Sequence, residues 1–198
     1  QEMGTLSYIS NNGLIYVMVG NSIYAIDVEG TEHVVVVDDL QEDGFVISQD
    51  SSVIAWQEGD DRYSCSTLSV MYLADGKKNT IQAPLGEYLK PLGFIGNDFI
   101  YGIAESTDIT SDISGQISFP MYAMQIVDKE GNIVTTYEES GAYVLGVEVD
   151  DGRIRVECAV LDYQKKPIDF FEDVLLRNEE DIAAAPSVLT TSTSNHKK

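Results

Sequence analysis

The chain has 198 residues, of which 43% are hydrophobic, a balance that is typical of a folded protein and argues against disorder of the whole chain. Its 33 Asp and Glu residues against 12 Lys and Arg residues give a formal net charge of -21, which excludes nucleic acid and anionic membrane surfaces as partners by charge repulsion. The longest apolar stretches, such as residues 14–20, are far shorter than the roughly 20 residues of a membrane-spanning helix, so no transmembrane segment is expected.

Four short polar turns, each followed by an apolar run, recur along the chain. Measured from Gly13 through Ser52 and Asp98 to Gly152, they are 39, 46 and 54 residues apart. Repeats of this length match the four-stranded blades of β-propellers. We therefore predict an all-β fold of four four-stranded antiparallel blades, which form a β-propeller or a half-propeller arc.

A second turn, rich in Asp and Gly, follows the first three apolar runs one strand later, at 27–30, 75–76 and 128–131. Asp bonds its own backbone there and Gly reaches positive φ, so each of these turns closes a hairpin. The two signals together predict one propeller domain or segment over residues 1–198. Its blades are expected at about 3–40, 44–83, 91–137 and 143–194.

The first three blades are predicted to contain strands at 5–9, 14–20, 22–28 and 33–38, then at 44–49, 53–58, 67–74 and 79–83, and then at 91–96, 99–104, 120–128 and 132–137. The fourth blade begins with strands at 143–149 and 153–162. Residues 168–176 have apolar residues at period 2 but also follow Pro167, so they fit a strand or a short helix, and their repeat position favours the strand. Residues 188–191 stand where a closing strand belongs.

Four blades are the lower limit of closed propellers, so the chain either closes alone or forms half of a larger ring. We expect the half-ring, because nothing after the fourth blade returns to complete the first, and a homodimer through the open blade faces would then cover them. The chain begins at Gln1 without a secretory signal pattern and is expected to be an excised segment. Cys65 and Cys158 fall on blades too far apart for a disulfide and are expected to be free thiols.

Residues 48–56, Ser-Gln-Asp-Ser-Ser-Val-Ile-Ala-Trp, resemble the Ser-Pro-Asp-Gly-x-x-Ile-Ala-Tyr element of TolB-like and prolyl-peptidase-type propellers. Gln49 replaces the usual Pro and Ser51 the usual Gly, and the copy at 94–102 keeps only the hydrophobic shape. The repeats also resemble uncharacterised surface lipoprotein-type propellers of Gram-positive anaerobes. The resemblance implies a binding or scaffold role outside the cytoplasm and carries no catalytic residue onto this chain.

Residue types that carry chemistry are sparse. Histidine, the commonest acid or base near neutral pH, occurs only as His33 and His196, and neither has a candidate partner. The sequence holds no Gly-x-Ser-x-Gly nucleophile elbow, no glycine-rich phosphate loop, no zinc-ligand spacing and no calcium-loop spacing. We therefore predict no catalytic residue, no metal and no cofactor.

Loop length varies most in one set of connections, which join the second and third strands of a blade, at 59–66, 105–119 and 163–167. In a propeller these lie on one rim with the connections between blades, at 39–44, 83–90 and 138–142, and variable loops on a rigid frame often carry function. The candidate binding residues on this acidic rim are Asp60, Asp61, Tyr63, Tyr88, Asp108, Asp112, Phe119 and Tyr143. Ordinary loop variation explains the same lengths without any binding.

These observations favour a noncatalytic module of a cell-envelope or secreted protein, which holds a protein, a peptide or a polysaccharide on the rim. One alternative is an accessory region of a hydrolase whose catalytic domain lies outside this segment. Another is a propeller glycosidase with acidic catalysts, which requires two carboxylates about 5 to 10 Å apart in a cleft.

Overall fold

The computed structural model describes residues 6–27, 29, 32–59, 61–150, 152–176 and 190–192. All regular elements in these ranges are β-strands: four four-stranded antiparallel sheets follow one another along the chain, and one two-stranded hairpin lies within the third. This confirms the predicted all-β fold of four-stranded antiparallel blades. No helix in the described ranges is long and apolar enough to cross a membrane.

The first two sheets are simple meanders. The first sheet holds, in spatial order, β1 (Ser7–Ile9), β2 (Leu14–Val19), β3 (Ser22–Asp27) and β4 (His33–Val37). The second sheet holds β5 (Phe45–Ile47), β6 (Val53–Gln57), β7 (Thr67–Tyr72) and β8 (Lys77–Gln82). Each strand pairs with the next one in the chain, so every link within a sheet is a hairpin.

The third and fourth sheets have longer strands. The third holds β9 (Glu87–Ile95), β10 (Asp98–Glu105), β13 (Ala123–Val127) and β14 (Ile133–Tyr137). Between β10 and β13 the chain forms a small separate hairpin of β11 (Thr110–Ser111) and β12 (Ile117–Ser118), which the sequence did not predict. The fourth sheet holds β15 (Tyr143–Asp150), β16 (Arg153–Leu161), β17 (Pro167–Leu176) and β18 (Thr190–Ser192).

Two uncertain segments of the sequence can now be assigned. Residues 168–176 belong to strand β17, as their repeat position favoured. The expected closing strand at 188–191 overlaps β18, although residues 188–189 lie outside the described residues. The first strand of the third sheet begins at Glu87, earlier than the expected residue 91, because Glu87 to Lys90 pair with the end of β10.

The turns form where Asp and Ser side chains bond the local backbone. In the turn between β5 and β6, the Asp50 carboxylate accepts the backbone N–H of Ser52 at 3.0 Å and the hydroxyl of Ser48 at 2.8 Å. In the turn between β13 and β14, the Asp128 carboxylate accepts the N–H of Asn132 at 2.8 Å. These bonds replace strand pairing at the point where the chain reverses, so the turns predicted from the sequence are also the turns observed.

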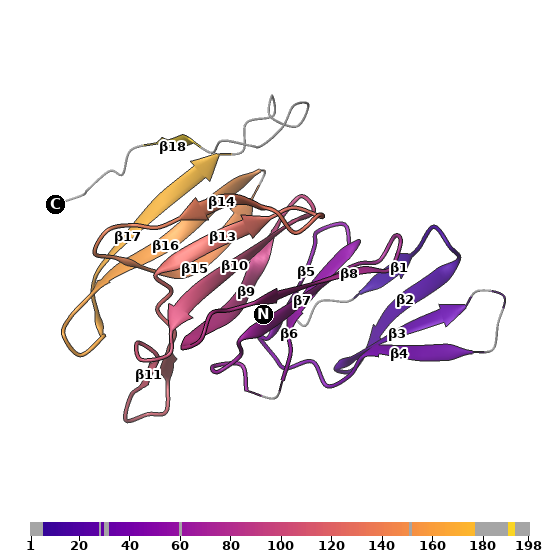
Figure 1. The fold of residues 1–198 in the computed structure, drawn as a ribbon, viewed down its shortest axis with the longest axis horizontal. Helices are drawn as coiled ribbons and strands as arrows, with labels where there is room; N and C mark the ends of the chain where they lie inside the picture. Colours follow the sequence, from indigo (N-terminus) through magenta and orange to yellow (C-terminus); the bar gives the residue numbers. More distant parts are fainter. Residues whose placement is uncertain are drawn as a thin grey trace.

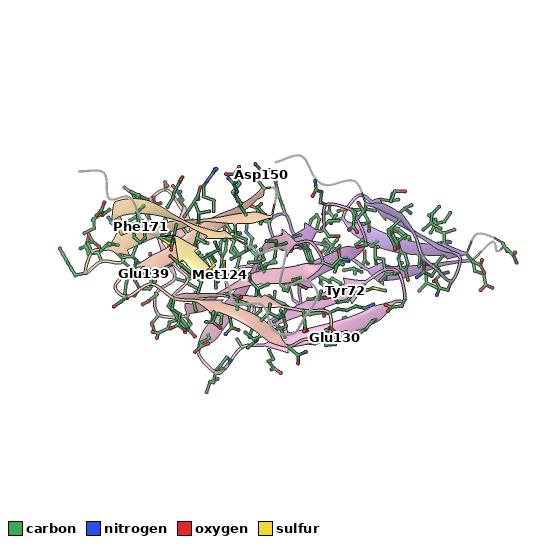
Figure 2. The ribbon with its side chains drawn as sticks, turned by 90° about the horizontal axis from the view of Figure 1, so that it is seen from above. Tyr72, Met124, Glu130, Glu139, Asp150 and Phe171 are labelled. Atoms are coloured by element: carbon green, nitrogen blue, oxygen red, sulfur yellow. The ribbon has the colours of Figure 1, made fainter. Side chains whose placement is uncertain are left out.

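The hydrophobic core consists of three layers, one between each pair of neighbouring sheets. Strand β6 is buried over its whole length, and so are residues 99–104 of β10, because sheets cover both of their faces. Packing is tightest at Gly102 of β10, where an added Cβ would lie 1.9 Å from the Sδ atom of Met121. Met124 lies in the same layer and is fully buried (Figure 2).

The four sheets form an open arc. Figure 1 shows the first sheet, β1 to β4, and the fourth sheet, β15 to β18, at opposite ends of the long axis. The inner strands β5, β9 and β15 contact one another in turn, as the innermost strands of propeller blades do. Of the two forms predicted from the sequence, the structure therefore adopts the arc, and within the described residues no further sheet covers the outer faces of the first and last sheets (Figure 1).

Candidate functional site

Six connections gather at one end of the sheets, which we call the loop end. Backbone hydrogen bonds between sheets hold it together: Leu89 donates to the Cys65 carbonyl at 2.7 Å, and Met121 donates to the Val144 carbonyl at 2.9 Å. The Arg62 guanidinium donates to the Glu42 carbonyl at 3.0 Å. The loop end consists of residues 38–44, 58–59, 61–66, 83–86, 106–122, 138–142 and 162–166.

Asp61 and Tyr63 are fixed within the connection of the second sheet, and Asp60 lies outside the described residues. The Asp61 carboxylate accepts the N–H of Tyr63 at 2.9 Å and the hydroxyl of Ser64 at 2.8 Å. These bonds hold the pKa of Asp61 below its usual value. The Arg62 guanidinium lies 4.8 Å from the centre of the Tyr63 ring, so this connection is ordered by its own side chains.

Tyr88 and Phe119 do not lie on an exposed rim. Tyr88 belongs to strand β9 and is half-buried, and Phe119 is only 7% exposed. Both pack in the core layer between the third and fourth sheets, together with Tyr63. The Lys90 ammonium lies 5.9 Å from the centre of the Phe119 ring, and burial lowers the pKa of Lys90. The prediction that these aromatic side chains punctuate a loop surface is corrected, because their rings complete the core at its loop end.

Asp108 lies in an ion pair that joins the third and fourth sheets. Its side chain is 9% exposed, and its Oδ1 atom lies 2.8 Å from the Lys165 ammonium. The same ammonium donates to the Tyr143 hydroxyl at 3.2 Å. Lys165 thus connects Asp108 and Tyr143, two of the predicted site residues. Lys165 itself was not predicted, because the turn at 162–166 contains no recognisable motif.

Asp112 stands apart from the other predicted residues, in the turn of the β11–β12 hairpin that projects from the sheets (Figure 1). Its carboxylate accepts the N–H of Ser114 at 2.8 Å and the N–H of Gln116 at 3.0 Å. The pKa of Asp112 is lowered by the Ser114 hydroxyl first and then by these backbone donors. Asp112 therefore shapes an exposed turn.

Three further carboxylates surround Tyr122 at the loop end of the third sheet. Glu87, the first residue of β9, stands directly opposite Glu105, the last residue of β10. The pKa of Tyr122 is raised to about 12 by burial, by a hydrogen bond with Glu87, and by the charges of Glu87, Glu138 and Glu105. None of the ion pairs among the described residues involves these three glutamates. We call Glu87, Glu105 and Glu138 the glutamate cluster.

An open groove of about 790 Å³ lies at the opposite end, between the inner strands β5, β9 and β15. Its lining is mixed, with apolar residues such as Leu92 and Val149 beside the polar Asp50 and Asn97. Asp150 lies at its edge, on the surface of the molecule in Figure 2. The Asp50 carboxylate in this groove is occupied by the hydroxyls of Ser48 and Ser52, which lie at 2.8 and 2.7 Å.

No protein-family model matches the sequence, and no curated protein matches it. Among solved structures, the β-propeller domain of the trilobed protease from Pyrococcus furiosus, which has an open velcro topology, is 11% identical with a TM-score of 0.43. That match covers 87% of this chain and 54% of the other. The Kuenenia stuttgartiensis hydrazine synthase is 14% identical with a TM-score of 0.39, over 94% of this chain and 53% of the other.

Dipeptidyl peptidase 4 of Porphyromonas gingivalis is 11% identical with a TM-score of 0.27, over 96% of this chain and 39% of the other. The chain thus spans about half or less of the length of these three structures. β-Propeller domains are among the structural neighbours, at low identity. The assignment of the architecture rests on the four sheets themselves.

Proposed function

We propose that this chain is a noncatalytic binding module whose loop end holds a cationic segment of a protein or peptide. The observation that supports the proposal is the glutamate cluster, in which Glu87 and Glu105 are direct cross-strand neighbours. Like charges in such a pair destabilise the sheet, and a bound Lys or Arg side chain would remove that repulsion. Within this proposal the module belongs to a secreted or cell-envelope protein, as the repeat resemblance implies.

The chemistry of the neighbouring groups favours binding over catalysis. Asp108 is neutralised by Lys165 at 2.8 Å, and the Asp61 carboxylate is used in holding its own turn. The glutamate cluster, in contrast, presents carboxylates at the surface next to a tyrosine ring, and both Glu105 and Glu138 are exposed. An acidic, partly aromatic surface suits a basic peptide better than a neutral polysaccharide, because the attraction is electrostatic.

The test is calorimetric titration of the chain with a synthetic oligolysine peptide. We expect the variant E87Q/E105Q/E138Q to bind at least about tenfold more weakly at low salt, because it loses the charges that attract the peptide. The matched control is E29Q/E32Q/E130Q, which removes the same charge from exposed glutamates at the turns of the opposite end. The control should bind the peptide as the parent chain does.

Equal weakening in both variants would contradict the proposal, since it would show attraction by net charge alone. Retained binding in E87Q/E105Q/E138Q would contradict it as well. A far-ultraviolet circular dichroism spectrum of each variant establishes that the sheets are intact. The cluster variant is expected to unfold at a slightly higher temperature than the parent, because the repulsion between opposite glutamates is gone.

A further inference from the structure

The outer face of the first sheet is mostly apolar, with Ser7 and His33 as its polar members. Side chains alternate between the two faces of a strand, and Tyr16 and Ile23 point toward the second sheet, in the core layer. The alternate residues therefore point outward. Paired across the strands they form one row of Ile9, Ile15, Ile26 and His33 and a second row of Ser7, Val17, Tyr24 and Val35, with Val19 beyond them.

Contacts and exposure confirm this orientation. The Tyr24 and His33 rings lie 6.0 Å apart, as expected for diagonal neighbours on one face. Ile9 is 69% exposed, Val19 61% and Val35 46%. Of the outward residues named above, none is Asp, Glu, Lys or Arg, although the whole chain has a net charge of -21. A contiguous apolar face of this kind marks an interaction surface.

The outer face of the fourth sheet differs in chemistry. Arg155 at its centre forms ion pairs with Glu148 on one neighbouring strand and with Glu172 on the other, the latter at 3.8 Å. Glu157 stands opposite Glu172 in the same register, and Phe170 joins the face at the loop end. Covering this face with the apolar first sheet would remove charges from water without offering them partners. The two ends of the arc are therefore not complementary to each other.

We propose that two copies of this chain pair through the outer faces of their first sheets, related by a twofold axis. A partner for that face must match two mostly apolar rows that hold no acidic residue, and the same rows on a second copy do so. The Asp38 carboxylate, which accepts the Ser22 hydroxyl at 2.6 Å, lies beyond the rows, next to the Val19–Ser22 pair. The packing continues the sheet-on-sheet contact that already joins the first and second sheets. It also lets two strongly acidic chains meet through rows of side chains that hold no carboxylate.

The experiment is sedimentation equilibrium of the full chain from about 1 to 100 μM, a range that resolves micromolar dissociation constants. We expect a monomer–dimer equilibrium. The variant I9K/V35K places charges on the two edge strands, β1 and β4, so that any face-to-face contact meets at least one of them. It should weaken the dimer at least about tenfold, because like charges are then buried against each other.

The matched control is I168K/F170K in β17, where the replaced side chains are 64% and 67% exposed. This control makes the same chemical change on the last sheet and should leave the dimer unchanged. A monomer at every concentration overturns the proposal, and so does a dimer that I9K/V35K leaves intact. Near-ultraviolet circular dichroism of each variant shows whether the core is preserved.

Cross-linking identifies the surface directly. Val17 lies in a middle strand of the first sheet, so the V17C variant should form a disulfide-linked dimer under mild oxidation. The E157C variant, in a middle strand of the fourth sheet, should not. A mixed disulfide between V17C and E157C chains would overturn the twofold arrangement, because it would show the first sheet of one copy packed on the fourth sheet of another.

Discussion

Asp108 is expected to stabilise the fold and not to bind the cationic peptide, and a substitution at this position can distinguish the two roles. We expect D108N to lower the free energy of unfolding by about 1–3 kcal/mol, since it removes a charged partner from a hydrogen bond at a nearly buried position. Oligolysine binding should be unaffected. The measurement is urea denaturation with parallel calorimetric titration. A normal unfolding free energy with weakened binding would contradict this assignment.

The pH dependence gives that prediction a second readout. The pKa of Lys165 is raised by its hydrogen bond with Asp108 first and then by the Tyr143 hydroxyl. A raised pKa means that the pair stabilises the fold fully below the unfolded-state value of 10.5 and stops doing so as pH rises through the folded value. From neutral pH upward, the difference in unfolding free energy between the parent chain and D108N should therefore stay constant to about pH 10.5 and shrink above it.

At the same scale, the sequence indicates residue types but not their neighbours. An acidic rim with tyrosines could be predicted, because such residues crowd the variable connections. Which of them meet depends on register: Glu87 and Glu105 are far apart in the chain and become neighbours only when β9 and β10 pair. Phe119 was predicted to lie on the exposed rim because it stands in a loop. Its ring instead completes the core, which a loop position in the sequence does not reveal.

Among the described elements, we expect the β11–β12 hairpin to contribute least to the stability of the core. The exposed Ile113 and the self-contained Asp112 turn indicate that its outer part contributes little to packing. We expect replacement of residues 110–118 by a short Gly-Ser link to preserve the sheets and to change the melting temperature by less than about 4 °C. Ile109 and Phe119 stay, because both contact the core.

Differential scanning calorimetry of the shortened chain is the measurement, with F119A as the contrasting variant. Removing the Phe119 ring should cost about 3–5 kcal/mol, the usual cost of deleting a buried aromatic side chain. Comparable losses in the two variants would show that the hairpin supports the core after all.

Most elements could be predicted from the sequence because their turns have specific chemistry. Asp128 and Gly131 close the β13–β14 turn as expected, with Gly131 at a φ of 86°. The missed element, β11–β12, pairs only two residues on each strand, too few to produce a period-2 pattern. Strand β9 starts before the expected residue 91 and continues through Pro91, which pairs with Tyr101 beside a register shift.

For the whole molecule, the net charge of -21 is the dominant electrostatic property. Self-repulsion destabilises a compact acidic chain, so we expect the melting temperature to rise as salt increases from about 10 to 300 mM, which shortens the screening length from about 30 Å to below 10 Å. The measurement is thermal unfolding at fixed protein concentration. Sodium and choline chloride should act alike; a rise with only one cation would indicate specific ion binding instead of screening.

The overall architecture was easier to predict than the contacts between side chains. Repeats of 39 to 54 residues and their hairpin turns indicate propeller blades even when the strand pairing is not known. The alternatives of a hydrolase accessory region and a propeller glycosidase stay predictions, as does the finer resemblance to TolB-like propellers. The glutamate cluster depends on side chains at the ends of different strands of the third sheet, and no pattern along the sequence records that geometry.

The first sheet has a mostly apolar outer face and the last sheet has a charged one, so the two ends of the arc differ. In the proposed assembly this difference would determine how many copies join. A subunit with two matching adhesive ends grows into rings or fibres, because each addition exposes another attachment point. A subunit with one adhesive end stops at two copies. If the first sheets pair as proposed, the ion-paired Arg155 face would end the assembly at two copies, and the end that does not bind would limit the stoichiometry.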